Sequence, residues 1–435
     1  MLKRKNKAPY ISAVFGGIVI LLAAGFGIWL AVTDAATKVK APTRPIPNPN
    51  AYDYYVDAAG KMVNENEVSD AISHYKPPTS AAKLPPLSPE LRAALKSYGA
   101  SGTPQMPPPP RKYSLSEKKA LIKANEPALQ SLREGFKYEC LCPQLDPTIA
   151  FRKYVTLREL ARLTSLDCQV CSESGEHGKA MQSCLDGIQL GGDTIKGSEI
   201  MGFLISISIQ AIAIHEATPD LIGNLNATEA QSAVTRLDKI LAKYTPFSEI
   251  LKNEKFSGIQ RLQSPVYYSP PGTMAPRVGT TTSLFNRIML PGHITDWDKT
   301  IADTAIPYPQ YSKLPPQSGS ILFRIIAPVI SKARLRYEHT LCNNHMLLLQ
   351  LVLRSYKATT GAYPSKLTDL TPKYLAKLPP DRFAPSGTYK YKQTAKGYIL
   401  YSIGPDGKDN AGIPVTVRGT PEPKDRGDIV VEHIK

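Results

Sequence analysis

Prolines set the first limits on what this chain can fold into. Thirty-nine of its 435 residues are proline, and they gather around residues 42–49, 77–110, 265–276 and 307–316. A proline lacks the backbone N–H that a helix or an interior strand needs, and it restricts the residue before it. These stretches therefore predict linkers or irregular segments, with regular structure between them. The length of the chain predicts two or three domains.

The N-terminus has a basic cluster followed by a long apolar run. Four Lys or Arg residues lie within the first seven positions, and the apolar run covers residues 10–32. A helix of this length can cross the roughly 30 Å hydrocarbon core of a membrane. The positive-inside rule then makes residues 1–33 a cytoplasmic tip and a transmembrane anchor, with the rest of the chain outside the cytoplasm. A cleaved signal peptide, with a mature start near Ala36, is the alternative.

The region after the anchor changes from proline-rich to helical. Residues 34–113 predict a Pro-rich stalk with short helices, and residues 114–252 predict a bundle of α-helical hairpins. The helices expected in the bundle cover residues 118–136, with a cap at Ser116, and residues 146–171, 176–190, 198–216 and 228–244. The apolar run Ile200–Ile214 is too short for a second membrane span, so it predicts a helix buried by its neighbours.

The C-terminal half predicts one irregular segment and one regular module. Residues 253–320 are rich in Pro, Gly and Tyr without a clear period, so we expect a long irregular segment over the bundle. Residues 321–435 predict a long helix, Leu322–Thr359, that stops at Gly361. Short strands are expected at residues 388–393, 398–402 and 429–432, as in a small antiparallel sheet. The expected fold class is α+β, mainly α.

Six cysteines offer two kinds of site. Cys140-x-Cys142 and Cys168-x-x-Cys171 have spacings at which thiolates can converge on zinc. A turn expected after Cys171 would bring Cys168 and Cys184 to the same height on facing helices, which makes a disulfide between them geometrically reasonable. An exported domain lies in an oxidising compartment, where thiols tend to pair. Packing of both residues as free thiols in an apolar core is the other interpretation.

One loop near the C-terminus gathers oxygen ligands. Asp406, Asp409 and Asn410 lie close together in the chain, and Asp428 follows further along. Neighbouring glycines permit the positive φ angles that turn backbone carbonyls inward. Hard oxygen ligands in a flexible loop are what Ca²⁺ selects. These four residues therefore predict a calcium loop, and a plain turn at residues 405–407 is the alternative.

The last quarter of the chain has its motifs in a characteristic order. The long helix is followed by a Tyr-Pro turn at 363–364, a Pro-rich approach, a strand pair and the segment Tyr401–Gly407, which reads Y-S-I-G-P-D-G. This order resembles the globular domain of type II secretion major pseudopilins. In that family a Y-S-x-G-x-D-G segment and a terminal Asp-Ile pair, matched here by residues 428–429, form a calcium-holding loop. The insertion at 411–426 and the absence of a prepilin-peptidase signature depart from the family, so assembly by the pilin route is not implied.

Charge and motifs narrow the class of function. The net charge of +16 is spread through the chain, so nucleic acid is not expected as a specific partner. The sequence has no P-loop, dinucleotide fingerprint or nucleophile elbow. The whole chain also resembles large membrane-anchored proteins of the bacterial envelope. We therefore expect a non-catalytic scaffold or binding protein with a protein partner. It would span the bacterial cytoplasmic membrane once, with its N-terminus in the cytoplasm and its bulk in the periplasm or at the cell surface. An accessory role in secretion or DNA uptake and an envelope hydrolase with an unrecognised site are the alternatives.

Overall fold

The computed structural model describes most of the chain after the predicted anchor. The described residues are 44–72, 111–143, 147–263, 280–315, 319–395, 397–416 and 420–431. Among them, no helix combines the length and the apolar character that a membrane span requires. The predicted anchor at residues 10–32 and most of the predicted stalk lie outside the described residues, so the anchor stays a prediction.

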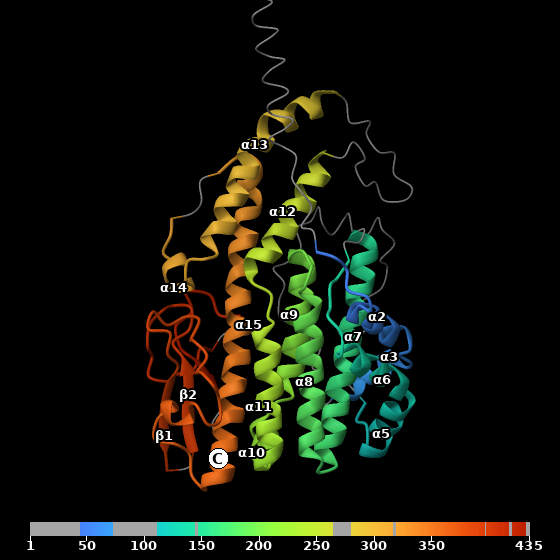
Figure 1. Ribbon diagram of the computed structural model, residues 1–435, viewed down its shortest axis with the longest axis vertical. Coiled ribbons are helices and arrows are strands. Elements are labelled where there is room, and N and C mark those ends of the chain that lie inside the picture. The colour runs from blue at the N-terminus through green and yellow to red at the C-terminus, as the bar shows by residue number, and fades with distance from the viewer. Residues whose placement is uncertain are drawn as a thin grey trace, which may run out of the picture.

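Long helices lie side by side along the longest axis of the molecule, and a small sheet flanks them (Figure 1). The long helices of this layer are α7 (Pro147–Glu173), α8 (His177–Thr194), α9 (Ile200–His215), α11 (Ala227–Ala242) and α15 (Ile321–Thr360). Three shorter helices pack beside α7, namely α2 (Ala51–Gly60), α3 (Glu65–Ala71) and α5 (Leu115–Ala124), and α6 (Glu126–Gly135) packs on α2. The remaining helices are α10 (Pro219–Asn224), α12 (Phe247–Gln263), α13 (Thr280–Asp303) and α14 (Tyr308–Tyr311).

Side-chain caps fix where several helices begin. The hydroxyl of Ser114 accepts a hydrogen bond from the backbone N–H of Glu117, whose carboxylate accepts the N–H of Ser114, so α5 starts with a capping box. The predicted cap at Ser116 was therefore wrong by two positions. The single helix predicted at 118–136 was also wrong, because α5 ends at Ala124 and α6 begins after Asn125, with Pro127 in its first turn.

The N-terminal part of the predicted stalk belongs to the folded body. Tyr52 and Tyr55 of α2 are buried, and the hydroxyl of Tyr55 donates to Asp193 Oδ2 of α8 at 2.7 Å. The backbone N–H of Ala51 donates to the carbonyl of Glu139 at 3.0 Å. The prediction of a stalk over 34–113 is therefore corrected for residues 44–72, because aromatic burial holds them against the bundle.

The prediction of an irregular segment at 253–320 was wrong for most of its described residues. The helix α12 continues to Gln263, and α13 occupies Thr280–Asp303 with Pro291 inside it. Tertiary packing explains α13 despite its proline, because Trp297 is buried and its ring lies 5.8 Å from that of Phe323 on α15. This segment therefore adds helices to the body.

The C-terminal elements are confirmed. The helix α15 ends at Gly361, which has the left-handed conformation with φ of +86° that favours glycine. Three strands follow, β1 (Lys390–Thr394), β2 (Gly397–Ser402) and β3 (Ile429–Val431). They pair antiparallel in the order β1-β2-β3. The described residues are thus mainly helical with a small antiparallel sheet, as expected.

The buried side chains of the described residues form three apolar clusters. The first cluster runs from α8 and α11 through α15 to the sheet, so that Leu185 and Leu400 belong to one core. The second lies between α2, α3, α6 and α7. The third joins the start of α9 to α12, α13 and the N-terminal half of α15. Because α15 contributes to the first and third clusters, the predicted boundary between residues 320 and 321 does not separate two cores.

Candidate functional site

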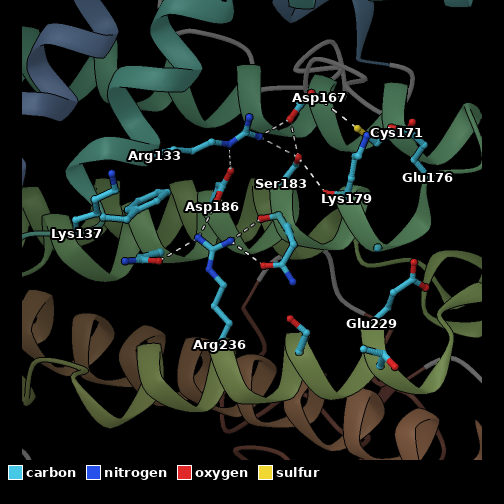
Figure 2. Close-up of a pocket in the computed structure, with 16 residues that line it drawn as sticks. Arg133, Lys137, Asp167, Cys171, Glu176, Lys179, Ser183, Asp186, Glu229 and Arg236 are labelled. Carbon is cyan, nitrogen blue, oxygen red and sulfur yellow. Dashed lines mark hydrogen bonds and ion pairs between the residues drawn. The ribbon is translucent and has the colours of Figure 1, made fainter.

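A broad groove of about 1000 Å³ opens between α6, α7, α8 and α11. Figure 2 shows the charged side chains that these helices direct into it. Its charged residues are Arg133, Lys137, Asp167, Glu176, Lys179, Asp186, Glu229 and Arg236. Its volume exceeds the roughly 300–400 Å³ of three other pockets among the described residues, which makes it the candidate site.

Two arginines share one buried carboxylate at the centre of the groove. Arg133 of α6 donates its Nε to Asp186 Oδ2 at 2.9 Å, and Arg236 of α11 donates an Nη to Asp186 Oδ1 at 2.7 Å. In Figure 2 the two guanidinium groups approach Asp186 from opposite sides. Because the carboxylate accepts from both, it fixes the distance between α6 and α11 across α8.

Further contacts restrain each arginine. Arg133 also donates to Asp167 Oδ2 at 2.7 Å. Burial alone would lower the pKa of Arg133, but the carboxylates of Asp186 and Asp167 outweigh it and raise this pKa. Arg236 donates to the carbonyl of Gln182 at 3.0 Å, and its guanidinium lies 5.4 Å from the ring centroid of Phe136. Both cations are therefore held in place before any partner arrives.

Cys171 and Ser183 are two potential nucleophiles of the groove. Burial and then Asp167 raise the pKa of Cys171 to about 11, so the group is a thiol at neutral pH. The hydroxyl of Ser183 donates to Asp167 Oδ2 at 2.6 Å. The same carboxylate oxygen also accepts a hydrogen bond from Arg133. This arrangement offers fixed charges and hydrogen-bonding groups, which suit recognition of a partner surface.

Sequence reasoning missed this groove. Its residues lie between positions 133 and 236 on four helices, and no motif spacing connects them. The one available signal was the presence of charged residues on faces of predicted helices, which is usual for solvated helices as well. The groove became visible only when the ion pairs that join α6 and α11 to Asp186 of α8 were known.

The cysteines separate into two groups. Cys140 and Cys142 lie in the second cluster, whereas Cys168 and Cys184 lie in the first, so the two spacings considered for zinc do not converge. All six cysteines are described, and none is disulfide bonded. The thiol of Cys184 donates to the carbonyl of Ala213 at 3.1 Å. The structure thus has Cys168 and Cys184 in one apolar cluster, both as free thiols.

Asp428 reaches the C-terminal loop despite the long insertion before it. Its Oδ1 accepts the backbone N–H of Asn410 at 3.1 Å, and its Oδ2 accepts that of Gly412 at 2.7 Å. Asp428 is fully buried. Gly404 has φ of +72°, and a Cβ at this position would lie 3.1 Å from the carbonyl oxygen of Gly427, so the turn needs glycine here.

The side chains of the other predicted calcium ligands also form hydrogen bonds with backbone groups. Asp406 Oδ1 accepts the N–H of Lys408 at 3.0 Å, and Asp409 Oδ1 accepts that of Ala411 at 2.9 Å, a bond that lowers the pKa of Asp409. Asp409 Oδ2 pairs with Lys390 Nζ at 3.3 Å. The amide nitrogen of Asn410 donates to the carbonyl of Lys408 at 2.9 Å.

As arranged, this loop does not present a calcium donor set. An ion would have to displace the ammonium of Lys390 and several N–H donors. No group of three or more His, Cys, Asp or Glu side chains within the described part of the chain is placed to hold a metal. Asp406 Oδ2 is buried without a hydrogen-bond partner, which is one free oxygen rather than a coordination shell. Calcium binding stays a prediction.

Comparison with known proteins leaves the function to be argued from this geometry. No family model matches the chain, and neither the curated proteins nor the solved structures contain a significant match to it.

Proposed function

We propose that this chain is a non-catalytic, membrane-anchored scaffold or binding protein of the bacterial envelope, and that the groove between α6, α8 and α11 receives a protein partner. The observation that carries the proposal is the shared carboxylate of Asp186, which fixes Arg133 and Arg236 at the centre of a wide groove. Charges that the fold holds in advance cost little further ordering when a partner binds.

The balance of charges in the groove favours a protein over a polyanion. Four basic and four acidic side chains line it: Arg133, Lys137, Lys179 and Arg236 against Asp167, Glu176, Asp186 and Glu229. A nucleic-acid site needs an excess of basic groups to neutralise phosphates. A mixed surface instead complements a protein surface that carries both signs.

The C-terminal part of the proposal is a pseudopilin-like module. What supports it is the succession of a long helix, a Gly361 stop, a three-stranded antiparallel sheet and a loop closed by Asp428. In this chain the module shares its apolar core with the bundle. We therefore propose that it acts as part of the same body, and that it does not function as a separate domain.

Site-specific photo-crosslinking in membranes tests the proposal. A benzophenone amino acid replaces Ser232, an exposed residue that lines the groove, and in a control chain it replaces Lys408, an exposed residue of the C-terminal loop. We expect a discrete adduct from position 232, lost when Lys179→Glu reverses one charge at the edge of the groove, and no such adduct from position 408. Adducts of the same pattern from both positions, or none from position 232, would reject the groove as a partner site.

A further inference from the structure

The first turns of α15 are apolar on two opposite sides. Phe323 and Ile330 face inward and are only 1% and 2% exposed, as members of the third cluster. On the other side, Ile321, Ile325 and Val329 are 60%, 70% and 51% exposed. These three residues are spaced by four positions, so they form one continuous stripe on the helix. We call them the outer stripe.

A surface helix needs apolar residues only toward the core, and an exposed apolar row marks a contact surface. The inner side of α15 is already covered by α13, where Trp297 packs against Phe323. The outer stripe is therefore available for a further contact.

Basic residues accompany the outer stripe. Arg324 lies within its span, and Lys332 follows one turn after Val329; both residues are exposed. Apolar side chains beside Lys and Arg make up the kind of helix face that binds anionic lipid surfaces, because acyl chains take the apolar groups and headgroups take the cations. This charge complementarity selects a membrane over a neutral apolar partner.

The described chain begins beside the middle of α15, where the ring of Phe247 at the start of α12 lies 5.3 Å from that of Tyr337. Arg44 forms an ion pair with Glu249 of α12, and Ile46 beside it is 60% exposed. The helix α12 packs on α13, and α13 packs on the N-terminal half of α15 (Figure 1). Residues 34–43 separate the predicted anchor from Arg44, and such a length of chain spans at most about 40 Å. The outer stripe lies roughly 20 Å along α15 from Tyr337, so a bilayer that holds the anchor is within reach of it.

We infer that the outer stripe of α15, together with Arg324 and Lys332, docks on the anionic surface of the membrane in which the chain is anchored. This inference rests on the proposed function, because the anchor supplies the high local concentration of lipid. Docking gives the body a second attachment besides the tether. The folded body, and with it the groove, then has one fixed orientation relative to the membrane.

Fluorescence quenching on the full chain tests this contact. A fluorophore is attached through Ile325→Cys, or through Ala358→Cys as a matched control in an exposed turn of the same helix, about 50 Å away. The parent chain, treated with the same fluorophore, gives the background labelling of the native cysteines, of which only Cys171 is not buried. The vesicles contain phosphatidylglycerol and a lipid with a nitroxide in its headgroup. We expect quenching at position 325 to be at least threefold that at position 358, and Arg324→Glu with Lys332→Glu to remove most of the difference.

Flotation of the same vesicles separates docking from anchoring. Flotation in both low and high salt with equal quenching at the two positions would overturn docking and leave the anchor in place. Flotation in low salt only, with stronger quenching at position 325, would retain docking and reject the anchor. No flotation at either salt would reject both. Disulfide-linked dimers of the Ile325→Cys chain would overturn docking in favour of contact between two copies.

Discussion

Arg382 donates its Nε to Glu338 Oε2 at 2.6 Å, which ties the segment before β1 to the middle of α15. Glu338 is completely buried, and its Oε1 lies 2.7 Å from the Nε of Arg334. One carboxylate therefore pairs with two arginines. Removal of one member of a buried ion pair is costly because the remaining charge has no solvent to replace its partner.

Glu338→Ala should lower the free energy of unfolding by about 3 kcal/mol or more. The matched control is Glu134→Ala, which removes an ion pair with Lys137 in which both side chains are largely exposed. That change should cost less than about 1 kcal/mol. Urea titrations of both variants give the two values. Equal losses of stability would show that Glu338 is not the central charge of this cluster.

Gly191→Ala should destabilise the contact between α8 and α9. A Cβ at this position would lie 2.8 Å from the carbonyl oxygen of Ser206 and 2.5 Å from Cγ of Gln210. Overpacking of this kind costs about 1–3 kcal/mol. Gly258→Ala is the control, because Gly258 lies within α12 and a Cβ there meets nothing within 4 Å. The control should be neutral or gain up to about 1 kcal/mol, so in thermal melts only Gly191→Ala should lower Tm.

Glu216 should make the stability depend on pH. Burial raises its pKa from 4.5 to about 7, although Gln169 donates to both carboxylate oxygens at 3.2 Å and Lys118 lies near enough to lower it. Between pH 4.5 and pH 7, Glu216 is therefore mostly protonated in the folded chain and mostly ionised in the unfolded chain. The contribution of Glu216 is thus complete below pH 4.5 and is lost as the pH rises to about 7, by roughly 3 kcal/mol.

Urea titrations at pH 5 and pH 8 check this dependence. Glu216→Gln should remove about 2.5 kcal/mol of the difference between the free energies of unfolding at these two pH values. Glu65→Gln makes the same chemical change at an exposed position of α3 and should leave the difference as it is in the parent chain. A parent and a Glu216→Gln chain with the same pH dependence would contradict the raised pKa.

The resemblance of the tail to pseudopilins predicts stabilisation by calcium. If calcium binds only the folded chain, a hundredfold excess over Kd adds about 2.7 kcal/mol. Melts of the whole chain in calcium and in chelator measure the effect, since the module shares a core with the bundle. Asp406→Ala should abolish the difference. Identical melts of the parent chain in both solutions would leave these carboxylates as acceptors for backbone N–H groups only.

Helices with strong local signals were predictable from the sequence. The helix α15 has an apolar pattern, a capping Ser320 and a terminal Gly361, and its predicted ends lie within one residue of those observed. The helix α13 was missed because its threonines and Pro291 disfavour a helix locally. It forms because Trp297 finds its burial against α15, a contact between residues distant in sequence.

The candidate sites show the same division. The C-terminal loop was found because its aspartates are close in sequence, but their hydrogen bonds to backbone N–H groups could not be read from spacing. The groove was not found at all. Its central unit joins Arg133, Asp186 and Arg236, and about 50 residues of sequence separate Asp186 from each arginine. Such a site exists only after helices pack, so no local pattern encodes it.

The shared membership of α15 in two cores also limits how the chain can vary in length. A single residue inserted between Phe323 and Leu353 would turn one part of the helix by about 100° relative to the other. The third cluster and the first cluster could then not both keep their contacts, because each requires its own side of the helix. Insertions and deletions in related chains are therefore expected in the surface connections, with the middle of α15 kept at constant length.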